Sequence, residues 1–216
     1  MNVQSRYRTI AGVSVPDTPI THSALTFALT HCDPYLFNHA VRSWLFAVRV
    51  AQIEGITHDE EIVALGTLLH DVTLNDRFAG PRRFEVEAAD IAKRFAIEME
   101  MGNERAQRVW DIVALNSTPS IALYKETEVS LCTAAIGLDV IGYRFGVIPA
   151  EEMSAILQEY PRLNLKKQLT KCFCHIAETA PETTFDNFVR DYGRRFVVGY
   201  RATSVVDLVC DAPFEE

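Results

Sequence analysis

The stretch from Ile62 to Leu69 most constrains how this chain can fold, because it holds only apolar residues apart from one glycine and one threonine. A helix that is apolar on all sides is normally buried at the centre of a domain. Thr57 and Glu60 form a capping-box pattern at the start of this segment. The sequence therefore predicts a central, buried helix over 59–70 that ends on two polar residues, His70 and Asp71.

Most of the remaining chain shows helical periodicity, with proline and glycine at the segment boundaries. Few segments alternate as strands do, although Arg195–Tyr200 and Ser204–Val209 are β-branched enough to leave a strand as an alternative. The predicted class is all-α, a single compact domain over 19–200 with an N-terminal arm at 1–18 and a C-terminal tail at 201–216. Helices are expected at 20–31, 34–54, 84–95, 103–115 and 126–145, and near 150–160, 164–179 and 184–200.

Charge and cysteine usage bound the partners and the compartment. The net charge is −8, and nucleic-acid affinity depends largely on Lys and Arg, so we expect neither nucleic acid nor an anionic membrane surface as a partner. Five scattered cysteines, an odd number, and a polar N-terminus predict free thiols in a reducing cytoplasm. A small-molecule substrate is expected, and the apolar stretch Phe196–Tyr200 is compatible with a homodimer.

Four polar residues interrupt the apolar helices. His39 lies in the second predicted helix, His70 and Asp71 end the central one, and Asp139 stands in the middle of an apolar run. Buried carboxylates are rare unless they are paired or bind a metal. Each residue alone is a weak signal, since a single histidine on an apolar face is more often a core residue. Their order and spacing together predict that His39, His70, Asp71 and Asp139 hold one divalent metal.

That order resembles the HD-domain superfamily of metal-dependent enzymes, over roughly residues 18–180. Four segments of the sequence look more like one branch of this superfamily, the cyanamide hydratase-like group. These segments are NHAVRSWLFA (38–47), LLHDVTLNDRF (68–78), RRFEVEAADIAKRF (82–95) and KETEVSLCTAAIGLDVIG (125–142). The resemblance implies an all-helical fold, the same four metal ligands, and a hydratase or hydrolase activity.

Two positions depart from related patterns. Many HD phosphohydrolases carry Lys or Glu four residues after the motif histidine, where this chain has the apolar Leu74. The hydratase-like group often has a histidine before the Pro119 turn, where Asn116 stands here, and an amide is a poor ligand for first-row metals. These departures weaken a phosphate-directed role and favour a single ion: zinc first, with iron, manganese or nickel as alternatives.

The sequence also suggests residues around the ion. Asn38, Arg42 and Asn116 are predicted to bind substrate, and Asp71 or Glu87 to relay a proton. Asn75 and Asp76 could orient the ligands, or simply form a turn. The leading hypothesis is that the enzyme adds water to a small, mostly uncharged molecule. The metal would lower the pKa of the bound water that attacks.

Two alternatives stay open at this point. One is a phosphohydrolase acting on nucleotides, which would need a basic lining. The other is a catalytically silent helical module that binds a ligand or a partner. The basic lining of the first alternative could come from Arg42, Arg77, Arg82, Arg83 and Lys125.

Overall fold

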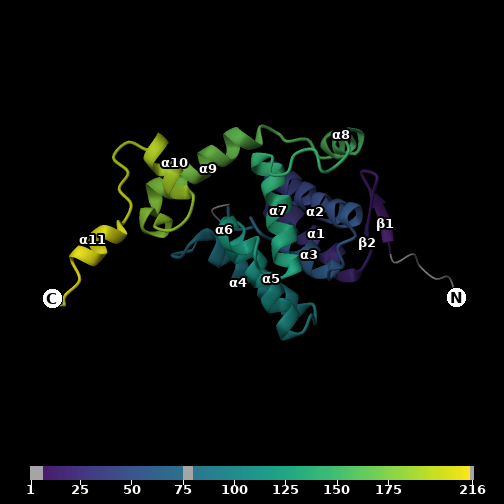
Figure 1. Ribbon diagram of the computed structural model, residues 1–216, viewed down its shortest axis with the longest axis horizontal. Helices are drawn as coiled ribbons and strands as arrows, with labels where there is room; N and C mark the ends of the chain where they lie inside the picture. The colour runs from purple at the N-terminus through teal and green to yellow at the C-terminus, as the bar shows by residue number, and fades with distance from the viewer. Residues whose placement is uncertain (1–6, 75–79, 215–216) are drawn as a thin grey trace. The chain divides into compact units, whose positions relative to one another are not determined.

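The structure, a computed structural model, describes residues 7–74 and 80–214, and within them it confirms the all-α class (Figure 1). The chain divides into two compact units, Met1–Gly80 with Phe84–Leu165, and Pro81–Arg83 with Lys166–Glu216. The first unit contains β1 (Tyr7–Ile10), β2 (Val13–Pro16), α1 (Pro19–His31), α2 (Pro34–Glu54), α3 (Glu60–Leu68), α4 (Phe84–Glu98), α5 (Asn103–Leu115), α6 (Pro119–Ala122), α7 (Thr127–Ile141) and α8 (Ala150–Glu159).

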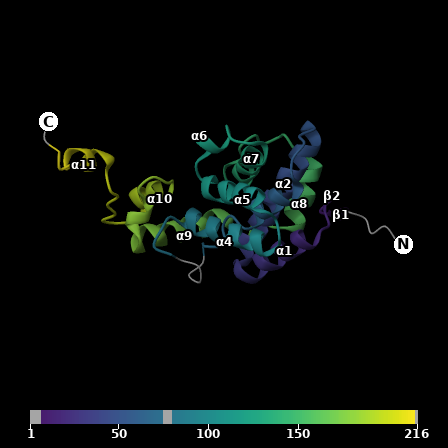
Figure 2. The same cartoon turned by 90° about the horizontal axis from the view of Figure 1, so that it is seen from below.

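The helix α3 is the centre of the first unit, as its apolar sequence predicts. Every residue from Ile62 to Leu68 is buried, and α3 packs against α1, α2, α5 and α7. Figure 1 shows α2 and α7 next to α3, and Figure 2 shows α2 and α7 beside each other. Gly66 allows the close approach to α5, because a Cβ at this position would lie 2.7 Å from side-chain atoms of Ile112. The packing of α3 therefore fixes where its C-terminal end lies.

The two ends of α3 differ from the predicted ones. Its N-cap is Asp59, whose carboxylate accepts hydrogen bonds from the amides of Glu61 and Ile62, so the Thr57–Glu60 capping box does not form the cap. The helix ends at Leu68, and His70 and Asp71 lie in the turn that follows. A turn frees the two side chains from the helical repeat, so that both can point to one side.

Proline and glycine mark the other helix boundaries near the site. Pro34 begins α2 and Gly55 ends it in the left-handed conformation, both as predicted. The helix α7 ends at Ile141 rather than continuing to Phe145, because Gly142 adopts a φ of 73° and caps it. Asp139 therefore lies in the last turn of α7, close to the helix end.

The N-terminal arm contains a β-hairpin that the sequence analysis did not predict. β1 and β2 pair antiparallel, with Ile10 opposite Val13. The turn residues Ala11 and Gly12 both have positive φ values (48° and 83°), as the common two-residue hairpin turn requires. Val13 and Val15 are buried in the core, but strands of four residues are too short to reveal their alternation in the sequence.

The second unit contains α9 (Leu165–Thr179) from Lys166 onward, a 3₁₀ helix (Pro181–Thr184), α10 (Val189–Phe196) and α11 (Val205–Cys210). Its aromatic rings cluster around Phe173, whose ring centroid lies 4.8 Å from that of Phe188 and 5.0 Å from that of Tyr192. The helix predicted near 184–200 is shorter in the structure, where it covers Val189–Phe196. Neither Arg195–Tyr200 nor Ser204–Val209 forms a strand. That residues 19–200 fold as one domain stays a prediction.

Among the residues that the structure describes, no helix is both long enough and apolar enough to cross a lipid bilayer.

Asp59 gives a stability test of the central helix. Asp59→Ala removes the N-cap and the ion pair with Arg105 (Nε–Oδ2 2.8 Å), and should lower the free energy of unfolding by about 1–2 kcal/mol. Asp59→Asn keeps a capping oxygen and should cost less than about 1 kcal/mol, the usual range for a partly exposed ion pair. Equal losses in the two variants, measured by urea unfolding, would contradict the capping role.

The Asp59 effect should also depend on pH. Burial raises the pKa of Asp59, but the hydrogen bond from Arg105 and those from the two amides outweigh it and lower the pKa below 3.8. The stabilising contribution is therefore complete above the ordinary carboxyl pKa and is lost as the pH falls through the lowered folded-state value. The stability difference between the parent chain and Asp59→Asn should shrink in acid.

Candidate metal centre

Three buried side chains from two elements converge on one point. His39 lies in the second turn of α2, and His70 and Asp71 lie in the turn after α3. His39 Nε2 lies 3.1 Å from His70 Nε2 and 3.6 Å from Asp71 Oδ2, and His70 Nε2 lies 3.2 Å from Asp71 Oδ2. Within the described residues, these three side chains form a group of potential metal ligands.

Hydrogen bonds on the far side of each ring determine its tautomer. His70 Nδ1 lies 2.7 Å from the carbonyl oxygen of Thr67, which can only accept, so Nδ1 carries a proton. His39 Nδ1 lies 2.6 Å from Asp139 Oδ2, a carboxylate oxygen, so it too carries the proton. In the neutral form, each Nε2 then has a lone pair and no hydrogen. The two Nε2 atoms lie 3.1 Å apart.

Two imidazole lone pairs and a carboxylate oxygen at this spacing repel one another unless a cation lies between them. A tetrahedral zinc ion with bonds of about 2.0–2.1 Å separates its ligand atoms by about 3.3 Å. The three observed separations, 3.1, 3.2 and 3.6 Å, bracket that value. The donor set therefore fits a divalent ion with three protein ligands and at least one open position.

The electrostatics of the centre favour positive charge. Burial alone would lower the pKa of His70, but the carboxylate of Asp71 outweighs it and raises the pKa. Burial raises the pKa of Asp71, but the charge and hydrogen bond of His70 outweigh it and lower the pKa. Both directions mean that a cation between these groups is stabilised, whether it is a proton or a metal ion.

Asp139, the fourth predicted ligand, lies on the far side of His39 from the converging atoms. Its Oδ2 is bonded to His39 Nδ1, and Arg42 donates from Nε to Oδ1 (2.8 Å) and from Nη2 to Oδ2 (2.7 Å). Arg162 Nη1 donates to Oδ1 (2.9 Å). Burial raises the pKa of Asp139, but the hydrogen bonds from Arg42 and His39 outweigh it and hold the pKa well below its usual range. It is therefore an ionised partner of His39.

The predicted substrate-binding residues are engaged elsewhere. The amide of Asn38 donates to the carbonyl of Pro161 (2.9 Å), and that of Asn116 donates to the carbonyl of Val113 (2.7 Å) at the end of α5. Arg42 is fully buried against Asp139. These contacts give all three residues structural roles, and their binding of substrate stays a prediction.

The predicted proton-relay residues also differ in their placement. Asp71 lies at the centre, whereas Glu87 is half-buried in α4 and packs against Gly80, where an added Cβ would lie 2.4 Å from Glu87 Oε1. Within the described chain, Glu87 is not part of the group of potential metal ligands. Asn75 and Asp76 lie outside the described residues. Of the two carboxylates, Asp71 is the one at the converging atoms.

Sequence reasoning did not identify Arg162 as part of this centre. It follows Tyr160 and Pro161 in the segment between α8 and α9, more than a hundred residues from His39. No periodicity or motif distinguishes it from the other surface arginines, so only the folded structure reveals the contact with Asp139.

A cavity of about 430 Å³ lies apart from the converging ligands, around the start of α3, with Ile56, His58, Asp59 and Arg105 in its lining. None of the three potential ligands lines it. The comparison with protein-family models found no match for this chain, and the search of curated proteins found none either.

Metal binding predicts a shift in thermal stability. Zn²⁺ or Co²⁺ at about a hundred times its Kd should stabilise the folded chain by about 2.7 kcal/mol, which raises Tm by roughly 5–10 °C for a protein of this size. His70→Ala should abolish the shift, whereas the surface variant His22→Ala should keep it. An equal shift in His70→Ala would contradict the proposed ligand set.

Proposed function

We propose that this chain is a metal-dependent enzyme that adds water to a small, mostly uncharged molecule. The observation that carries the proposal is the convergence of His39 Nε2, His70 Nε2 and Asp71 Oδ2, with the proton on each ring held at Nδ1. A divalent ion, when bound, would supply Lewis acidity, which lowers the pKa of water and polarises an electrophilic carbon. Zinc is the ion that this nitrogen and oxygen set suits best.

The residues of the chain have separate tasks in this proposal. His39 and His70 hold the ion, and Thr67 and Asp139 fix the orientation of their rings. Asp71 is ionised, because its pKa is lowered as described above, so its carboxylate can take up a proton from the attacking water. The side chains of His39 and His70 are 1% exposed and that of Asp71 is 9% exposed, so Asp71 is the least buried of the three.

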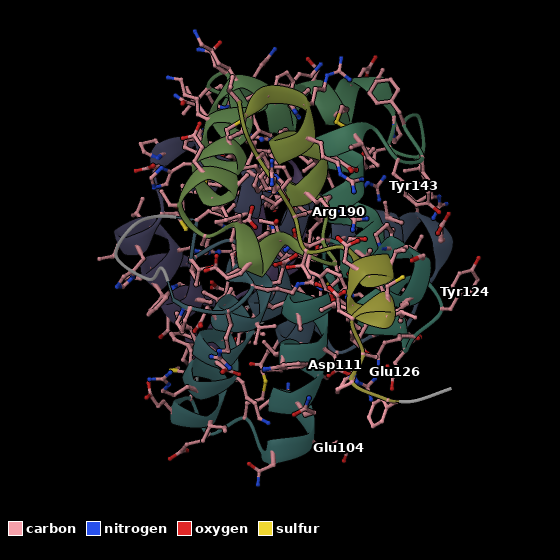
Figure 3. The ribbon with its side chains drawn as sticks, turned by 90° about the vertical axis from the view of Figure 1, so that its left-hand side faces the viewer. Glu104, Asp111, Tyr124, Glu126, Tyr143 and Arg190 are labelled. Carbon is pink, nitrogen blue, oxygen red and sulfur yellow. The ribbon has the colours of Figure 1, made fainter. Side chains whose placement is uncertain are left out.

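The charges around the centre support an uncharged substrate. The guanidinium of Arg42 is neutralised by Asp139, and Lys125 Nζ is bonded to Asp111 (2.9 Å) and close to Glu126 (3.6 Å). Figure 3 labels Asp111 and Glu126, which lie near each other. Leu74, at the position where many phosphate-cleaving relatives carry a charge, is buried. Two of the five candidate cations for phosphate binding thus already have acidic partners.

Of the remaining three cations, Arg77 lies outside the described residues. Arg82 and Arg83 belong to the second unit, in which Arg83 Nη1 pairs with Asp186 Oδ1 at 3.0 Å. The resemblance to cyanamide hydratases, together with the absence of charge at Leu74, makes cyanamide and small nitriles the first substrates to test.

The test is a substrate panel on the zinc-loaded chain. Cyanamide should yield urea and a small nitrile its amide, whereas nucleoside monophosphates should release no phosphate. Asp71→Asn should lower the rate by about 10²–10⁴-fold, as expected for loss of a proton acceptor that also faces the ion, and Glu60→Gln, which changes a half-buried carboxylate at the start of α3, should not. Phosphate release without nitrile turnover would contradict the proposal, and bound metal without any turnover would favour a binding module.

A further inference from the structure

We propose that Arg162 is a positioning residue of the metal centre, which holds Asp139 as the outer partner of His39 and thereby keeps Asp139 from binding the ion itself. The inference rests on the metal site proposed above, and it differs from the ligand set that the HD resemblance implies.

The segment Tyr160–Arg162 is hydrogen-bonded to α2, which carries His39, and to α7, which carries Asp139. Arg42 Nη1 donates to the carbonyls of Tyr160 (3.0 Å) and Pro161 (3.2 Å), and Asn38 Nδ2 donates to the carbonyl of Pro161. Arg162 Nη1 reaches back to α7 and donates to both the carbonyl (2.7 Å) and the Oδ1 (2.9 Å) of Asp139. The segment therefore links the helix of His39 to the helix of Asp139.

These contacts use the hydrogen-bonding capacity of the Asp139 carboxylate in full. Oδ1 accepts from Arg42 Nε and Arg162 Nη1, and Oδ2 accepts from Arg42 Nη2 and His39 Nδ1. A carboxylate oxygen has about two lone-pair sites, so neither oxygen retains one for an ion. Asp139 instead orients the ring of His39 and makes its Nε2 a better donor, as carboxylates behind metal-bound histidines do.

The arginines also set the charge of the centre. Asp139 is buried, and two guanidinium groups more than balance its charge, which leaves Asp71 as the carboxylate that faces the ion. Arg42 is fully buried, so its removal would leave an unpaired buried carboxylate and endanger folding. The side chain of Arg162 is 33% exposed, so water can replace it, and the variant can be tested in the folded protein.

The test compares the Kd for Zn²⁺ or Co²⁺ in Arg162→Gln and in Arg49→Gln, measured on the full chain by competition with a chelator. Arg49 has similar exposure (27%) and pairs with Glu152, so its loss also loosens the attachment of α8 to α2 without touching Asp139. Arg162→Gln should weaken metal binding about 10-fold, within the range for outer partners of metal ligands. Arg49→Gln should change the Kd for the metal less than about 2-fold, because Arg49 is not bonded to a metal ligand or to Asp139.

The melting temperature of the metal-free variants separates positioning from folding. Arg162→Gln should melt close to Arg49→Gln without metal and fall below it with metal. Arg162→Lys, which keeps one donor and the charge, should recover part of the affinity. Equal metal affinity in Arg162→Gln and the parent chain would overturn this inference while leaving the metal site intact. Failure of the parent chain to bind metal would overturn both this inference and the proposed function.

A second comparison tests the role of Asp139 itself. Asp139→Asn keeps an oxygen that can accept from His39 Nδ1, so it should weaken metal binding by no more than about 100-fold. Asp71→Asn replaces a ligand oxygen and should weaken binding further. If Asp139→Asn weakened binding as much as Asp71→Asn, with both variants folded, Asp139 would bind the ion directly and the inference would be wrong.

Discussion

His39 Nε2 and His70 Nε2 lie 3.1 Å apart, each with its ring proton held on the opposite nitrogen, and Asp71 Oδ2 lies within 3.6 Å of both. A cation between them, either a proton or a metal ion, stabilises three such atoms at this spacing in a buried site. The rest of the first unit supports this arrangement. The burial of α3 carries the His-Asp turn into the interior, and Thr67, one turn earlier, holds the ring of His70.

The second support is the buried network around Asp139. It connects α2, α7 and the segment after α8 through His39, Arg42 and Arg162. Such a network is costly to desolvate, and its stabilising value depends on every member being paired. Here the four groups satisfy one another, and the result is a histidine whose orientation is fixed from behind. Preorganisation of this kind would lower the entropic cost of ordering the ligands when an ion binds.

Much of this could be predicted from sequence because the signals were strong where burial is strongest. The apolar run 62–69 predicts the central helix, and Pro34 and Gly55 lie at helix boundaries as predicted, whereas Gly142 ends α7 earlier than predicted. The grouping of His39, His70 and Asp71 follows from polar residues in apolar surroundings. The role of Asp139 could not be resolved in this way, because a buried aspartate that binds a metal and one that pairs with arginine leave the same sequence pattern. Only the contacts of Arg42 and Arg162 separate the two.

The central claim is that an ion binds between His39, His70 and Asp71. Crystals of the zinc-loaded chain, with anomalous diffraction recorded on both sides of the zinc absorption edge, test it most directly. The account predicts one strong anomalous peak about 2.0–2.2 Å from His39 Nε2, His70 Nε2 and an oxygen of Asp71. Asp139 should still be bonded to His39 Nδ1. No peak at this position, or a peak bonded to Asp139 in place of Asp71, would contradict it.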